Sequence, residues 1–91
     1  MPIDIATGLL YIKNMNDKYY KTNDLALATA LQVVYEPARS IDKTNRSQPE
    51  FIFRNSKKLQ DYVNKFWRKE LLVDPLSYSN ELKNIKTRIY E

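Results

Sequence analysis

The sequence predicts a small two-layer α+β domain, in which a β-hairpin packs against three helices in the order α-β-β-α-α. Two observations lead to this prediction. Two short extended segments flank a polar loop, and three other segments repeat their apolar residues at helical spacing. A chain of 91 residues is long enough for one such domain and too short for two.

The first helix is expected from Leu25 to Tyr35. Asp24 precedes it with a carboxylate that can accept hydrogen bonds from the free amides of a first turn. Only Thr29 and Gln32 are polar in this run, so the helix should be buried on most sides, at the centre of the core. Pro37 ends the helix in place of a glycine cap.

The hairpin is expected from two extended segments, Ala38 to Asp42 and Glu50 to Arg54, which a polar loop of seven residues joins. The second segment alternates, so that Phe51 and Phe53 share one face, as a strand over a core requires. We expect this phenylalanine face to pack against the helices.

Two further helices are expected in the C-terminal half of the chain. Ser56 is a good N-cap for a helix over about Lys57 to Glu70, whose apolar positions fall at helical spacing at Leu59, Tyr62, Val63 and Phe66. Asp74 as N-cap and Pro75 at the first helical position start the last helix. Its apolar stripe comprises Tyr78, Leu82, Ile85 and Ile89.

Residues 1–18 are interpreted as an N-terminal arm, and residues 19–91 as the α+β domain. The arm holds the only glycine, Gly8, and a short apolar run from Leu9 to Ile12 that could form a strand and extend the sheet to three strands. An exposed strand of this kind can pair with its own copy, so a homo-oligomer assembled through the arm is one hypothesis.

The composition excludes several kinds of chemistry. The chain has no cysteine and no histidine, so it lacks a disulfide, a thiolate nucleophile, an imidazole base and the usual zinc ligands. Capping explains Asp24 and Asp74, and we expect Asp61 and Glu81 on solvent faces, so no acid–base pair emerges. We therefore expect a protein that is not an enzyme and has no cofactor or metal.

No apolar run approaches the length of about 18 residues that a membrane span requires. The first fifteen residues lack the basic region of a signal peptide and carry Asp4 instead. We therefore expect a cytoplasmic protein that does not interact with membranes.

The charge pattern leads to the first functional hypothesis, a non-catalytic module that binds nucleic-acid phosphates. The net charge is +4, and six cations stand against one acid between Arg54 and Lys69. Helical geometry places Lys58, Lys65 and Lys69 on one ridge. A solvated helix face would show the same pattern. The candidate phosphate ligands are Lys57, Lys58, Lys65, Arg68 and Lys69, with Arg39, Arg46 and Arg54 of the hairpin as a second basic element.

The aromatic residues lead to the alternative hypothesis, a protein-binding adaptor or inhibitor that uses exposed aromatics with a basic rim against an acidic partner. Trp67 falls near the border of the apolar stripe of its helix, beside two cations, and Tyr19 and Tyr20 are further candidates. A tryptophan at this border could equally cover the edge of a small core.

Five segments between Tyr20 and Tyr90 also carry a family resemblance: Tyr20–Ala28, Phe51–Phe53, Trp67, Val73–Pro75 and Leu82–Tyr90. Together they resemble a small family of prokaryotic and phage-associated domains of unknown function. A glycine often follows the first helix in that family, whereas this chain has Tyr35-Glu36-Pro37. The resemblance implies a stand-alone prokaryotic, plasmid or viral domain and supplies no site residues.

Overall fold

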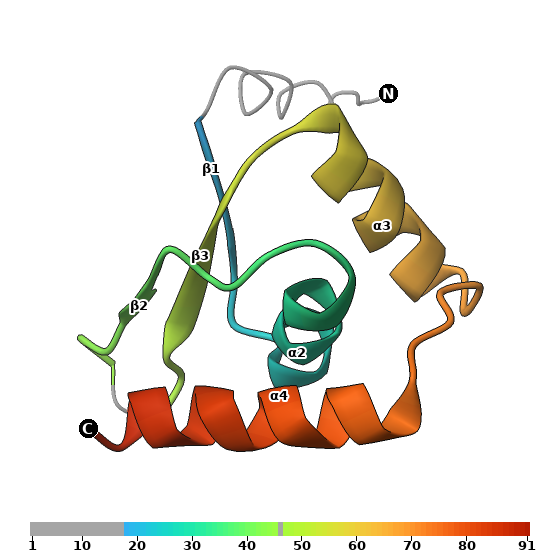
Figure 1. Cartoon of the computed structure of the whole chain (residues 1–91). Helices are drawn as coiled ribbons and strands as arrows, with labels where there is room; N and C mark the ends of the chain where they lie inside the picture. The colour runs from blue at the N-terminus through green and yellow to red at the C-terminus, as the bar shows by residue number, and fades with distance from the viewer. Residues whose placement is uncertain (1–17, 46) are drawn as a thin grey trace.

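A computed structural model of the protein describes residues 18–45 and 47–91. Its elements follow the order β1 (Tyr19–Thr22), α2 (Leu25–Val34), β2 (Ser40–Asp42), β3 (Glu50–Arg54), α3 (Lys57–Trp67) and α4 (Pro75–Ile89). The predicted α+β class, the hairpin and the three helices are confirmed (Figure 1). The apolar run at residues 9–12, expected as a strand, lies outside the described residues, as does most of the proposed arm.

The sheet has three strands in the order β1-β3-β2, and both outer strands run antiparallel to β3. A third strand is therefore present, but it is β1, at the start of the domain expected over residues 19–91, and not the run of the arm from which a strand was expected. Its register pairs Tyr19 with Arg54 and Thr22 with Phe51. Because β1 and β2 both oppose β3, they are parallel to each other, and α2 connects them with β3 lying between.

The core forms where α2 meets the phenylalanine face of β3. Figure 1 shows α2 nearly end-on at the centre, with the sheet on one side, α3 on the other and α4 across the bottom. The predicted strand alternation is confirmed, because Phe51 and Phe53 are fully buried while Ile52 is only partly buried. The other fully buried large apolar side chains come from the three helices: Leu27, Leu31, Leu59 and Ile85.

Three polar side chains start the three helices, as predicted. Asp24, Ser56 and Asp74 each accept a hydrogen bond from the backbone amide three residues further on, at distances of 2.9, 3.1 and 2.8 Å. Such N-caps satisfy amide groups that have no partner within the helix. The helix starts could be predicted because the signal lies within four residues of chain.

Two predicted boundaries, the start of one strand and the end of one helix, were wrong by a few residues. The strand expected from Ala38 begins at Ser40, because the backbone amide and carbonyl of Ala38 bond to side chains of Gln32 and Arg88. The helix expected to reach Glu70 ends at Trp67. Both corrections affect where the candidate site residues lie.

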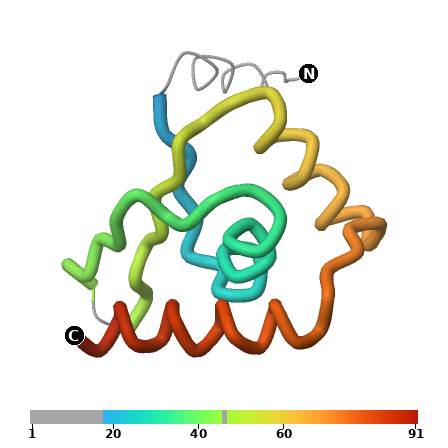
Figure 2. The backbone as a smooth tube through the Cα atoms, in the orientation of Figure 1, coloured from blue at the N-terminus to red at the C-terminus, as the bar shows by residue number. Residues whose placement is uncertain are grey.

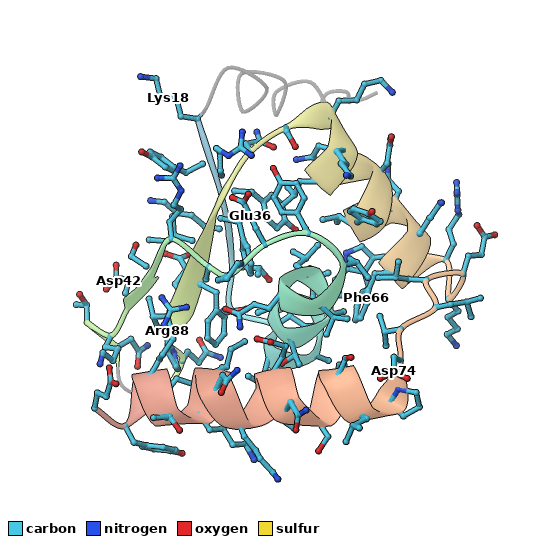
Figure 3. The ribbon with its side chains drawn as sticks, in the orientation of Figure 1. Lys18, Glu36, Asp42, Phe66, Asp74 and Arg88 are labelled. Atoms are coloured by element: carbon cyan, nitrogen blue, oxygen red, sulfur yellow. The ribbon has the colours of Figure 1, made fainter. Side chains whose placement is uncertain are left out.

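A buried polar network joins α2 to α4. Gln32, only 8% exposed, donates to Glu81 Oε1 at 2.9 Å and accepts from Arg88 Nη1 at 3.2 Å and from the amide of Ala38 at 3.0 Å. Arg88 also donates to the Ala38 carbonyl at 3.0 Å. Figure 3 shows Arg88 directed from α4 toward the interior. Glu81, which we expected on a solvent face, is therefore a half-buried member of this network.

The C-terminus of α4 is tied to the hairpin. Lys43 Nζ donates to the carbonyl of Arg88 at 3.0 Å and to that of Glu91 at 3.5 Å. Figure 2 shows the end of the chain lying beside the β2–β3 connection. A cation suits this position because the last carbonyls of a helix carry partial negative charge.

The Asp74 cap gives a testable pH dependence. Hydrogen bonds from the amide and side chain of Ser77 hold the pKa of Asp74 below its ordinary value. A lowered pKa stabilises the fold above the unfolded-state pKa of about 4, and this contribution is lost as the pH falls through the folded value. Asp74→Asn retains the cap but does not titrate. Below a pH of about 4, we expect Tm to fall less steeply in Asp74→Asn than in the unchanged protein. Circular dichroism measures Tm, and an equally steep fall in both proteins would contradict this role.

Candidate interaction surfaces

The basic helix α3 presents fewer free cations than the sequence predicted. Lys58 and Lys65 are exposed, and neither forms an ion pair with any residue in the described ranges. Lys57 Nζ instead lies 3.8 Å from Asp61 Oδ2, and Arg68 Nε lies 3.2 Å from Glu70 Oε1. These two cations already have an acidic neighbour, although such exposed pairs are weak.

Lys69 does not lie on the predicted ridge. Because α3 ends at Trp67, Lys69 follows the helix and has a backbone φ of 62°, in the left-handed region. Its side-chain direction therefore no longer follows the 100° step of a helix. The ridge of α3 is reduced to Lys58 and Lys65, which are two turns apart.

Of the cations expected to form the second basic element, Arg54 already has an acidic partner. Arg54 lies opposite Tyr19 of β1, and its guanidinium binds the Glu36 carboxylate through two hydrogen bonds of 3.2 and 3.4 Å. These bonds raise the pKa of Arg54. Arg39 is exposed beside the start of β2, and Arg46 lies outside the described residues.

The three aromatic candidates have different environments. Trp67 is 58% exposed, with its ring edge against Phe66 at a centroid distance of 5.0 Å. Tyr19 is also exposed, on the outer face of β1. Tyr20 instead packs against the core, and this burial raises the pKa of its phenol. Tyr20 is therefore less accessible to a partner than Tyr19 and Trp67.

Two exposed leucines follow Trp67 within the next nine residues of the chain. Leu72, in the connection between α3 and α4, is 90% exposed, and Leu76, in the first turn of α4, is 69% exposed. We call Trp67, Leu72 and Leu76 the apolar corner, since all three belong to the corner at which α3 gives way to α4 (Figure 1). Its neighbour Phe66 lies on the side of α3 that faces α2 (Figure 3).

Sequence reasoning missed both leucines, although a signal for each exists. Leu76 precedes the stripe of α4 and is about 180° from Ile85 in helical projection. It therefore cannot share the buried face. Leu72 lies between two predicted helices, where no periodic pattern assigns it to the core. Apolar residues that no helical stripe uses are candidates for contact surfaces.

The helical projection separates Trp67 from the lysine ridge. Lys58 and Lys65 fall within about 20° of each other, whereas Trp67 lies about 160° from Lys65 around α3. The tryptophan and the two free lysines of α3 therefore flank opposite sides of its buried stripe. One flat ligand cannot contact both sides at once.

The positive excess of the described chain is confined to α3 and its cap. From Lys57 to Lys69 there are five cations and one acid, whereas the other described residues hold eight of each. Within the corner segment, Arg68 is paired with Glu70 and Asp74 caps α4. Lys69 is the cation of that segment for which the described residues provide no acidic partner.

A polar hollow at the hairpin is lined by Asn23, Asp42, Thr44, Asn45, Gln48 and Glu50. No group of three or more acidic side chains within the described chain could hold a metal ion. Among the same residues, no helix has both the length and the apolar character needed to cross a membrane.

The fold and these surfaces define a small α+β domain whose most distinctive features are a basic helix and an adjoining apolar corner. A family model named domain of unknown function (DUF5659) matches residues 17–91, and the chain belongs to this family. The predicted resemblance to a family of domains of unknown function is thereby confirmed. The chain shows no significant match to a curated protein or to a solved structure.

Proposed function

We propose that the protein is a small non-catalytic module that binds another protein through the apolar corner. The supporting observation is that exposed apolar side chains are concentrated in one short segment of the chain. Five large hydrophobic side chains are exposed in the described chain, and three of them, Trp67, Leu72 and Leu76, occur within ten residues. Isolated exposed apolar residues are common, whereas groups of them mark contact surfaces. Tryptophan in particular is enriched among the residues that dominate binding energy.

The charge near the corner indicates the character of the partner. Lys69, the cation of the corner segment with no acidic partner among the described residues, favours a partner surface that is apolar at its centre and acidic at its margin. A two-fold contact with a second copy through this corner would bring the Lys69 side chains of both chains to one interface. Like charges would oppose that pairing, so we propose a partner of opposite charge.

Nucleic-acid binding through α3 is the second candidate, supported by the confinement of the positive excess to this helix and its cap. Arg54, Lys57 and Arg68, three of the eight predicted phosphate ligands, are already paired with carboxylates. On α3, only Lys58 and Lys65 lie on one ridge, and neither has an acidic partner in the described ranges. So few phosphate contacts would give weak binding, which is why we place this candidate second.

Trp67 fluorescence tests the proposal, because Trp67 is the only tryptophan of the chain. The full chain is titrated with a synthetic helical peptide that has leucines on one face and glutamates at its margins. We expect a blue shift of the emission as the indole leaves water. A control peptide with serine in place of leucine should give no shift, and one with lysine in place of glutamate should bind more weakly. No response to the Leu/Glu peptide would reject the proposed function.

An oligonucleotide titration under the same conditions tests the second candidate. We measure the anisotropy of labelled single- and double-stranded DNA and RNA at about 50 and 200 mM salt, since binding through phosphates weakens steeply over this range. If α3 binds nucleic acid, Lys58→Glu with Lys65→Glu should abolish binding, and the peptide should give no blue shift. Strong peptide binding with no oligonucleotide binding would reject the second candidate.

A further inference from the structure

Lys69 occupies a backbone position that favours glycine. It follows the last residues of α3 with φ 62°. The Lys69 amide bonds to the Phe66 carbonyl at 3.0 Å, and the Glu70 amide bonds to the Lys65 carbonyl at 2.8 Å. This pair of bonds is the Schellman ending of a helix, in which the left-handed residue is usually glycine because a Cβ atom is unfavourable there.

The described residues give the Lys69 ammonium group no compensating polar contact. Lys69 is exposed, and its ammonium group has no hydrogen bond or ion pair within the described part of the chain. The other cation of this turn, Arg68, does have a partner in Glu70. Glycine would therefore be the more stable residue at position 69 for the isolated domain.

The position of Lys69 suggests what the side chain does. It lies between Trp67 and Leu72, in the segment where the chain leaves α3, and is the cation of that segment with no acidic partner among the described residues. Residues with a strained backbone conformation tend to cluster at binding and active sites. We infer that Lys69 is a specificity-determining residue of the apolar corner, whose ammonium group binds a carboxylate of the partner. This inference rests on the proposed function.

The partner that fits is an amphipathic acidic segment. Its apolar side chains would cover Trp67 and Leu72, and a carboxylate at the margin would meet Lys69. Burial of the neighbouring apolar surface excludes water from such a charge pair and strengthens it. A partner with lysine at the margin would be rejected by like charge.

Three substitutions separate the strain from the charge. Lys69→Gly and Lys69→Asn remove the charge and suit the left-handed backbone, whereas Lys69→Arg retains both charge and strain. We expect Lys69→Gly to raise Tm by about 4 °C or more, with a smaller rise for Lys69→Asn. Both should weaken binding of the Leu/Glu peptide by about fivefold. Lys69→Arg should leave Tm and affinity within error of the unchanged protein.

Two controls make the result specific. Lys21→Gln removes a charge from β1, away from the corner, and should leave peptide affinity unchanged (Figure 1). A peptide with glutamine in place of glutamate should bind Lys69→Gly and the unchanged protein equally, because the charge contact is absent in both cases. Trp67 fluorescence serves as the readout throughout.

The outcomes distinguish this inference from the proposed function. If the unchanged protein binds the Leu/Glu peptide and Lys69→Gly binds it equally well, the role of Lys69 is overturned while the proposed function stands. If the unchanged protein does not bind, both are overturned. A Tm that does not rise in Lys69→Gly overturns the strain argument, and binding of oligonucleotides alone overturns the choice of partner.

Discussion

We expect Gln32→Leu to lower the free energy of unfolding by about 3 kcal/mol, a large share of the total stability of a domain of this size. Leucine fills a similar volume but offers no hydrogen bond. The amide of Ala38 would remain buried without its acceptor, and Glu81 and Arg88 would each lose a partner. An unsatisfied buried group costs about 1 to 3 kcal/mol. Glu81 and Arg88 are only half-buried, so their share is smaller.

Urea unfolding followed by circular dichroism measures this effect, and Thr29→Val is the matched control. Thr29 and Gln32 are the buried polar residues of the described chain, and both belong to α2. The Thr29 hydroxyl bonds only to the Leu25 carbonyl, which also takes part in the helix ladder. We expect Thr29→Val to cost less than about 1 kcal/mol. Equal losses for the two variants would show that the network joining α2 to α4 adds no special stability.

The parts of the fold that the sequence predicted are those with local signals. Asp24, Ser56 and Asp74 act within one turn of chain, and the alternation of Phe51 and Phe53 needs only one strand. The buried network was not predicted, because Gln32 meets Glu81 and Arg88 across separations of 49 and 56 residues. Local patterns identify an unusual polar residue in an apolar helix but do not identify its partners.

The candidate surfaces, like the fold, could be predicted only where a local pattern in the sequence indicates them. Helical spacing correctly indicated that Lys58, Lys65 and Trp67 leave the buried stripe of α3. It failed at Lys69, because the helix ends two residues earlier and a lysine stands where a glycine would have marked that end. The pairing of Arg54 with Glu36 depends on how the end of α2 meets the sheet. No pattern in the sequence reports that contact.

The largest effects on binding are expected from the apolar corner. Trp67→Ala should weaken binding of the Leu/Glu peptide at least about 30-fold, because a buried tryptophan at an interface is worth 2 kcal/mol or more. Leu72→Ser should give a smaller loss in the same direction. Since Trp67 is 58% exposed and Leu72 is 90% exposed, both variants should fold. The edge contact of Trp67 with Phe66 limits the stability loss of Trp67→Ala to about 1 kcal/mol.

Binding of these variants is measured with a labelled peptide, because Trp67→Ala removes the chain's only tryptophan. Tyr90→Ala is the matched control, since Tyr90 is also an exposed aromatic residue but lies at the other end of α4 from Leu76 (Figure 1). We expect its affinity to equal that of the unchanged protein. If Lys58→Glu or Lys65→Glu weakens binding more than Trp67→Ala does, charge on α3 dominates recognition. The apolar corner is then not the binding surface, and the basic face of α3 takes its place.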